Sequence, residues 1–155
     1  MEEIEIRELR SEDEDAVRGV DITTQRQYLG NKWDEMNEEE QEAHLVLKRS
    51  EFLVNIGTGF GFVAESGGRI VGFVLAHETL PFRGSVYIRH IAIVPGFQGR
   101  EIGGKLLEAV IEKAKSMGMK KVWSMINTDN PRSMKMHEKV GFKLRDRKEA
   151  VYEIG

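Results

Sequence analysis

A glycine-containing loop at the centre of the sequence has the composition of an anion-binding site. The apolar residues 91–94, three of them β-branched, precede it, and residues 106–117 after it carry apolar side chains at helical spacing. A strand, a loop and a helix in this order leave free N–H groups and the positive end of the helix dipole at the loop, where phosphate is favoured. Arg100 and Lys105 add positive charge. An ordinary strand-to-helix turn would carry the same glycines, so both interpretations stay open for the loop alone.

Other chemistries are weakly represented among the side chains. The chain has no cysteine, which excludes a disulfide, a thiolate metal site and a cysteine nucleophile. The histidines, His44, His77, His90 and His137, lack the spacing of zinc ligands, so no metal is expected. No P-loop motif, nucleophile elbow or Gly-x-Gly-x-x-Gly dinucleotide motif is present. Metalloenzymes, P-loop NTPases, serine hydrolases and dinucleotide enzymes are therefore disfavoured.

The elements that must position this loop are predicted from hydrophobic periodicity. Alternation predicts a strand at residues 4–9, and Ser11 with Glu14 forms a capping box that starts a helix. A second capping box at Asn37 starts another helix, which ends before Gly57. The later elements are a hairpin of residues 62–65 and 69–76, a strand at 85–94, a strand at 121–126, a short helix from Asn130 to Gly141, and two short strands in the tail 143–154. Because both alternating sets of strand 85–94 become apolar, this strand is expected to be central, with its C-terminal end beside the glycine loop.

Length, charge and hydropathy set broad limits. The 155 residues predict a single domain spanning 1–155. The 23 Lys and Arg against 26 Asp and Glu are too balanced for a broad basic face, so nucleic acid is not expected as a partner. The acidic start and the lack of a long apolar run argue against a signal peptide or membrane span, and with the lack of cysteine they predict a cytoplasmic protein.

Two motifs, taken in order, resemble those of the GNAT superfamily of acetyl-CoA-dependent N-acetyltransferases. They are Ile91-Ala92-Ile93-Val94-Pro95 followed by Gln98-x-x-Glu101-x-Gly103, and Asn130-x-x-Ser133-Met134-x-Met136-His137-Glu138-Lys139-Val140-Gly141-Phe142. The resemblance spans nearly the whole chain and is specific in its second half. It implies an α/β (α+β) fold with a mixed, mostly antiparallel sheet of about seven strands flanked by helices, splayed between the fourth and fifth strands. It also implies direct transfer of an acetyl group from acetyl-CoA to a primary amine in a ternary complex, with CoA as product.

The resemblance assigns cofactor contacts position by position. The loop matches the family's pyrophosphate-binding loop, and the strand before it matches the one that pairs with the pantetheine arm. The cofactor-binding residues implied are Ile91, Ala92, Ile93, Gln98, Gly99, Arg100, Glu101, Ile102, Gly103, Gly104, Asn130, Ser133 and Met136. Glu101 departs from the family's glycine, and its carboxylate either weakens CoA binding or points toward Lys105.

His137 and His90 are the catalytic candidates. His137 stands where the family has a tyrosine placed to protonate the departing CoA thiolate, and histidine can also supply a proton. The alternative is that His137 only packs against the cofactor. Met125 stands where some members carry a base, which leaves His90 as the best base candidate, although a core histidine is an equal alternative.

Tyr28, Trp33, Tyr87 and Arg89 are the candidate acceptor-binding residues, but aromatic residues at these positions could equally belong to the core. The expected partner is a small-molecule, protein or peptide amine, and a homodimer stays open. Two other functions also stay open. One is a non-catalytic acyl-CoA-binding or sensing domain of the same fold, and the other is a phosphate-binding module unrelated to acetyl transfer.

Overall fold

The computed structural model describes residues 3–45, 49–79 and 84–155. In these ranges five strands form one sheet in sequence order: β1 (Ile4–Glu8), β2 (Phe62–Ser66), β3 (Arg69–Glu78), β4 (Ser85–Ile93) and β5 (Lys121–Ser124). Neighbouring strands are antiparallel except β4 and β5, which are parallel. The predicted mixed, mostly antiparallel sheet is therefore confirmed, and so is the β2–β3 hairpin.

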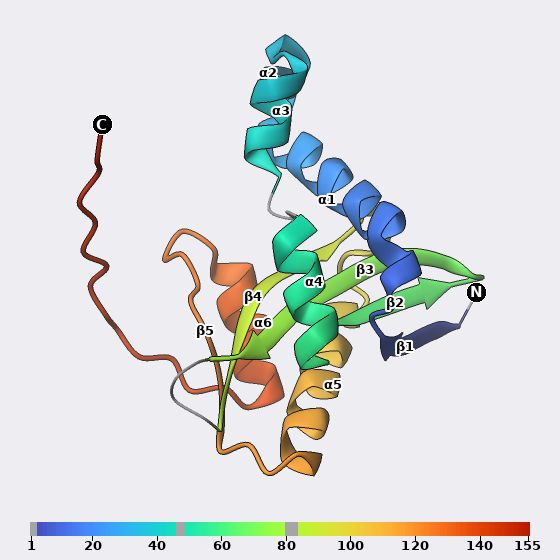
Figure 1. Ribbon diagram of the computed structural model, residues 1–155, viewed down its shortest axis with the longest axis vertical. Helices are drawn as coiled ribbons and strands as arrows, with labels where there is room; N and C mark the ends of the chain where they lie inside the picture. The colour runs from blue at the N-terminus through green and yellow to red at the C-terminus, as the bar shows by residue number, and fades with distance from the viewer. Residues whose placement is uncertain (1–2, 46–48, 80–83) are drawn as a thin grey trace.

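Helices cover both faces of the sheet. The helical elements are η1 (Ser11–Asp13), α1 (Glu14–Leu29), α2 (Asn31–Glu35), α3 (Glu38–His44), α4 (Arg49–Thr58), η2 (Pro95–Phe97), α5 (Ile102–Ser116) and α6 (Pro131–Val140). Figure 1 shows α1 and α4 in front of the sheet and α5 and α6 behind it. None of the helices in the described ranges is long and apolar enough to cross a membrane.

The core lies on both sides of β3, whose residues 71–76 are all buried. Behind the sheet, α5 contributes buried Leu106, Leu107, Val110 and Ala114 at the predicted helical spacing. Gly118 ends this helix with a positive φ of 73°, and Met119 N–H donates to Ala114 O over 2.9 Å. Such a C-terminal glycine satisfies the last carbonyl groups of a helix. The long helix after the loop is therefore closed at its C-terminal end.

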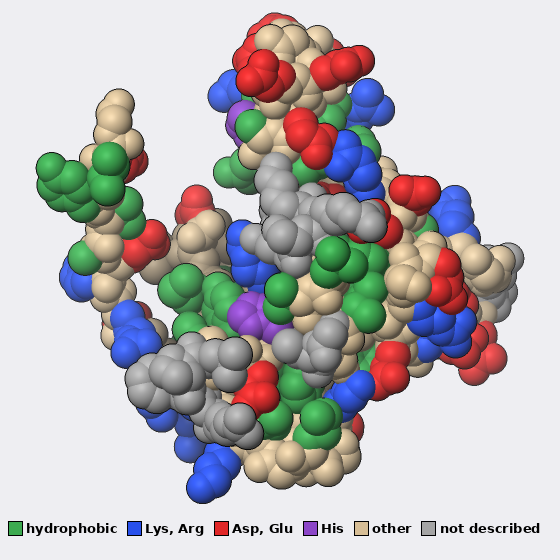
Figure 2. Space-filling model, in the orientation of Figure 1, with side chains coloured by type: hydrophobic (Ala, Val, Ile, Leu, Met, Phe, Trp, Pro, Cys, Tyr) green, Lys and Arg blue, Asp and Glu red, His purple; other side chains and the backbone are tan. Residues whose placement is uncertain are grey.

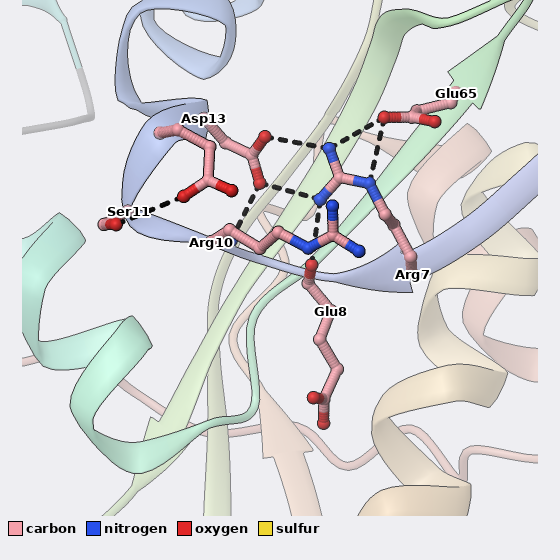
Figure 3. Close-up of polar contacts among 7 residues, drawn as sticks. Arg7, Glu8, Arg10, Ser11, Asp13 and Glu65 are labelled. Carbon is pink, nitrogen blue, oxygen red and sulfur yellow. Dashed lines mark hydrogen bonds and ion pairs between the residues drawn. The ribbon is translucent and has the colours of Figure 1, made fainter.

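Arg7 connects the amino-terminal elements through the ion-pair network in Figure 3. Its guanidinium donates to both carboxylate oxygens of Asp13 at 2.8 Å and to Glu65 Oε1 at 2.7 Å. Asp13 also accepts from Arg10 N–H over 2.7 Å, whereas Ser11 Oγ contacts Glu12. The predicted capping residue was therefore wrong. Asp13 fixes the turn before α1 because it is the residue that the Arg7 cation holds.

β4 carries one more residue than the β3 segment it pairs with. His90 lies opposite Leu75, but Ile88 lies opposite Ala76, so Arg89 forms a β-bulge. The extra residue changes the alternation of faces along β4. Tyr87 and His90 consequently lie on the α1 face, whereas Ile88 lies on the α5 face.

β5 accompanies β4 for only part of its length. The parallel pairing runs from Ser85 opposite Lys121 to Ile88 opposite Ser124. The last five residues of β4, Arg89 to Ile93, extend beyond β5. Of these, residues 90–93 pair with β3, and Arg89 is the bulge residue. The sheet is thus open between its fourth and fifth strands beside the glycine loop.

Two further predicted features of the fold were wrong. The tail 143–155 forms no strand, and each of its residues is exposed, so the sheet has five described strands rather than about seven. In Figure 1 this tail extends away from the sheet. Five consecutive charged residues, 145–149, separate its apolar side chains, and the apolar side chains Val151, Tyr152 and Ile154 stay exposed. The helix predicted after Asn37 is two helices, α3 and α4; Asn37 does cap α3 by accepting from Glu40 N–H over 2.8 Å.

Candidate active site

The glycine loop presents main-chain N–H groups at the start of α5. Gly99 has a φ of 78°, and Glu101 has a φ of 62° directly before the first helical residue, Ile102. The N–H groups of the first helical turn have no hydrogen-bond acceptor within the helix. No side chain among the described residues caps α5 either. Lys105 N–H is already bonded, to Glu101 O at 3.1 Å. The loop therefore offers a cluster of donors and the positive end of a helix dipole.

Glu101, next to this cluster in the chain, pairs its carboxylate with Lys139 on α6. The predicted alternative partner, Lys105, is not the one it contacts. The hydrogen bond and charge of Lys139 hold the pKa of Glu101 below its ordinary value. Among the described residues, Glu101 is the only non-glycine with a positive φ. The residue thus keeps the backbone conformation of a glycine and carries a charged carboxylate that is paired with Lys139.

Gly103 and Met136 determine how closely α5 and α6 approach each other. A Cβ atom on Gly103 would lie 2.3 Å from Met136 Sδ, far inside contact distance. At Gly104 the nearest atom to such a Cβ is Val140 Cγ2, at an ordinary 3.6 Å. Gly103 is buried under Met136, so it is a packing residue of the helix pair as well as a member of the loop.

The side-chain amide of Gln98 connects three elements at the open end of the sheet. Its Nε2 donates to Ile93 O over 2.9 Å and to Gln27 Oε1 of α1 over 3.1 Å. Arg132 Nη1 of α6 donates to Gln98 Oε1 over 3.3 Å. Nearby, the guanidinium of Arg100 lies 4.9 Å from the centre of the Phe97 ring. The loop is therefore held against β4, α1 and α6 by one polar side chain.

The three β4 residues predicted to bind cofactor differ in the direction of their main-chain N–H and C=O groups. Val94 N–H donates to Val71 O of β3 over 2.9 Å. Because main-chain groups alternate in direction along a strand, Ala92 also points toward β3, whereas Ile91 and Ile93 point toward the open side. The contact of Ile93 O with Gln98 agrees with this direction. Ile91 and Ile93 are thus placed to pair with an extended ligand, and Ala92 is not.

His137 lies in α6 and is only 2% exposed. Its Nδ1 is 2.7 Å from Ser133 O, and its Nε2 is 3.1 Å from Ser124 Oγ. Its ring also packs edge-on against Phe142, with 5.0 Å between the ring centres. Burial lowers the pKa of His137, so the imidazole is neutral near pH 7.

Asn130 and Ser133 position His137 from the start of α6. Asn130 Oδ1 caps the helix by accepting from Ser133 N–H over 3.2 Å. Ser133 Oγ lies 3.4 Å from His137 Nδ1, farther than the Ser133 carbonyl oxygen. The oxygen of the Asn130 side chain is therefore used within the protein, and its amide nitrogen is the group left to face a ligand.

His90 does not lie with His137. After the bulge it faces α1 and packs against Phe73, with 5.8 Å between ring centres, whereas His137 lies with Ser124 on the α6 face. Burial lowers the pKa of His90, and the Asp21 carboxylate on α1 opposes this shift. The two predicted catalytic histidines therefore approach the opening between β4 and β5 from opposite faces of the sheet.

The predicted acceptor-binding residues are also separated. Tyr28, near the end of α1, is 83% exposed, whereas Trp33 in α2 is buried and only 4% exposed. The Tyr87 ring packs against Trp123 of β5 at a 39° tilt, with 4.5 Å between ring centres, and makes an edge contact with His77 of β3 at 5.9 Å. The three rings form an aromatic row across three strands. Arg89 is exposed at the bulge beside this row. Sequence reasoning missed Trp123. The available signal was that this aromatic residue lies in the predicted strand 121–126.

Comparisons with known proteins agree with this geometry. The family described as the acetyltransferase (GNAT) family matches residues 24–142. N-alpha-acetyltransferase 30 of Schizosaccharomyces pombe is 32% identical over 87 residues, which are 54% of this chain and 57% of that protein. L-2,4-diaminobutyric acid acetyltransferase of Nocardia farcinica is 31% identical over 78 residues, 50% of this chain and 40% of that protein. The chain thus spans about half the length of the curated relatives it matches.

Solved structures show the same fold. PaiA N-acetyltransferase from Thermoplasma acidophilum in complex with coenzyme A superposes with a TM-score of 0.75 at 19% identity, covering 94% of this chain and 93% of that one. AAC(6')-Iy in complex with the bisubstrate analogue CoA-S-monomethyl-acetylneamine gives a TM-score of 0.71 at 19% identity, covering 99% of both chains. The family match covers most of the chain, and the fold agrees with it. The chain belongs to the acetyltransferase (GNAT) family.

Proposed function

We propose that this protein is an N-acetyltransferase that moves an acetyl group from acetyl-CoA to a primary amine. The observation that carries the proposal is the opening between β4 and β5. Main-chain N–H and C=O groups of β4 lie along it, and the N–H groups at the start of α5 lie at its end. Acetyl-CoA fits these groups chemically. Its pyrophosphate matches the donors of Ile102, Gly103 and Gly104, and its amide-bearing arm matches the main chain of Ile91 and Ile93.

The protein contributes mainly positioning and charge stabilisation. A neutral amine attacks the thioester carbonyl carbon, the C–N bond forms, and collapse of the tetrahedral species breaks the C–S bond. The Ile91 N–H group, on the open edge of β4, is positioned to donate to the oxyanion. Proton transfer falls to the α6 side, where His137 lies, and His90 lies on the side from which an acceptor would approach.

The acceptor approaches, in this proposal, along the α1 face. The aromatic row of His77, Tyr87 and Trp123 lies on that face next to the opening. Acidic side chains gather over α2 and α3 in Figure 2, including Asp34, Glu38, Glu39 and Glu40. Their field favours a cationic amine over an anionic acceptor. One relative is named for L-2,4-diaminobutyric acid and another as an N-alpha-acetyltransferase, which supports an amine on a small molecule or a peptide.

The activity is tested by measuring the CoA thiol released from acetyl-CoA in the presence of each amine of a panel. The panel comprises an aminoglycoside, 2,4-diaminobutyrate, a polyamine and peptides with free N-termini, each at low and high salt. Amine-dependent release that weakens with salt supports the proposal. If CoA binds but no amine accelerates its release, the protein is instead a non-catalytic acyl-CoA-binding domain.

A charge added to the loop tests the cofactor site separately from activity. Gly104→Asp places a carboxylate in the first turn of α5, and Gly104→Asn places a neutral side chain of the same size there. The space at Gly104 admits a side chain, and an acidic residue in a first turn favours the helix itself, so both variants should fold. Calorimetry should show CoA affinity roughly tenfold lower for Asp than for Asn, from Coulomb repulsion at short range. Equal affinities would contradict pyrophosphate binding at this loop.

A further inference from the structure

The hydrogen bonds of His137 determine which of its nitrogens can exchange a proton. Ser133 O is a carbonyl oxygen and can only accept, so the bond at 2.7 Å requires the proton to be on Nδ1. In the neutral ring Nε2 then carries a lone pair and accepts from Ser124 O–H over 3.1 Å. His137 at rest consequently has no N–H to offer to a leaving thiolate, and the only nitrogen that can take up a proton faces Ser124.

Ser124 lies where the two strands separate. It is the last residue of β5, and its pairing with Ile88 is the last contact in the β4–β5 register. The next residue of β4, Arg89, begins the bulged segment that borders the opening. Ser124 is half-buried, whereas His137 behind it is buried. Ser124 therefore adjoins the opening through its place at the end of β5, and the imidazole that its hydroxyl contacts is buried.

We infer that Ser124 is a catalytic residue that relays protons between the reacting atoms and His137 Nε2. This inference rests on the proposed acetyl transfer and assigns the proton route within it. Ser133 and Phe142 hold the ring so that Nε2 points at the Ser124 hydroxyl. His137 acts through Ser124 and is a positioning residue.

The relay balances over one turnover. When the amine nitrogen bonds to the thioester carbon, its surplus proton passes to Ser124 Oγ, and the original hydroxyl proton of Ser124 passes to His137 Nε2. When the C–S bond breaks, Ser124 donates its proton to the sulfur, and His137 Nε2 returns a proton to Ser124 Oγ. The amine loses one proton, CoA leaves as the thiol, and both side chains return to their starting states.

Kinetics of paired variants test the relay. Ser124→Ala should lower kcat by roughly 10²-fold or more with little change in the KM for acetyl-CoA, because only proton transfer is removed. Ser124→Thr keeps a hydroxyl and should recover much of the activity. Ser85→Ala makes the same change at the other end of the β4–β5 pair and should leave the rate unchanged. Equal rates for Ser124→Ala and the wild type would overturn the relay.

Nitrogen NMR of histidine-labelled protein tests the hydrogen bond independently of activity. The wild type should show a protonated Nδ1 and an accepting Nε2 for His137, and Ser124→Ala should shift the Nε2 signal while leaving Nδ1 nearly in place. A proton on Nε2 in the wild type would overturn the inference even if the enzyme is active. Failure of every amine to release CoA would overturn the proposed function and the relay together, while the spectrum would still decide the hydrogen bond.

Discussion

Glu101 and Lys139 form an ion pair that joins the turn before α5 to the last turn of α6. The two residues are 38 positions apart in sequence, and both side chains are exposed. The pair compensates the charge of a carboxylate next to the N–H groups that would meet a phosphate. It also occupies a cation that would otherwise be available close to those groups.

Replacing Glu101 should therefore strengthen CoA binding. Glu101→Gly removes the carboxylate, frees Lys139 and suits the left-handed backbone at this position. We expect CoA affinity to rise roughly two- to fivefold, with a gain that shrinks as salt is added. Lys139→Met leaves the Glu101 carboxylate without its ion-pair partner and should lower CoA affinity. Calorimetry at two ionic strengths measures both, and weaker binding by Glu101→Gly would show that the ion pair holds the loop in its binding geometry.

Adjacent glycines in α5 should differ sharply in their tolerance of a methyl group. Gly103→Ala forces the new Cβ into Met136, and overpacking of this kind costs about 1–3 kcal/mol of unfolding free energy. Gly104→Ala meets only an ordinary contact with Val140 and should be neutral or stabilising, since alanine favours helix. Urea unfolding compares the two. Equal stabilities would mean that the flexible Met136 side chain, or α6 itself, moves aside at little cost. A Met136→Ala change in the Gly103→Ala background should restore part of any loss.

The two buried histidines should make the fold sensitive to mild acid. Burial lowers the pKa of both His90 and His137 below the ordinary value of 6.5. As pH falls below that value the unfolded chain takes up protons before the folded one, so the free energy of unfolding decreases. Urea unfolding from about pH 7.5 to about pH 5.5 should show this fall. The slope should be shallower in the His90→Gln, His137→Gln double variant, and an unchanged slope would assign the effect to other groups.

The Arg7 network should stabilise the start of α1. Burial alone would raise the pKa of Asp13, but hydrogen bonds from Arg7 and from Arg10 N–H outweigh it, and the pKa lies below its ordinary value. The stabilising effect is complete above pH 3.8 and is lost as pH falls through the lowered value. At neutral pH, Asp13→Asn should cost about 1–3 kcal/mol, since charged hydrogen bonds are lost. Glu12→Gln on the exposed side of the same turn is the control and should cost almost nothing.

The sequence was sufficient for the elements around the glycine loop. Strand 85–94 corresponds to β4 (Ser85–Ile93), and the helices after Gly104 and Asn130 correspond to α5 and α6. These elements carry strong local signals: β-branched apolar residues, apolar residues at helical spacing, an asparagine cap and closing glycines. Local signals determine local geometry, so elements of this kind can be predicted without knowledge of the fold.

The features that escaped prediction depend on contacts distant in sequence. The bulge at Arg89, which places Tyr87 and His90 on one face, is visible only in the register with β3. The partner of Glu101 comes from another helix, and neither residue carries a signal for the other. The contact of Ser124 with His137 likewise arises from tertiary packing. Packing also decides between the two alternatives that the sequence left open for Trp33, which is buried. The catalytic and cofactor roles assigned to individual residues stay predictions until the variants above are measured.

The exposed tail after Phe142 has a practical consequence for handling the protein. Lys143, Arg145, Arg147 and Lys148 lie in backbone without helix or strand, and no residue from 143 to 155 is buried. Proteases bind their substrates as extended, accessible segments, so trypsin is expected to cut here before it cuts within the sheet. The shortened chain would keep every buried side chain of the described core, so limited digestion is expected to leave a smaller species with that core intact.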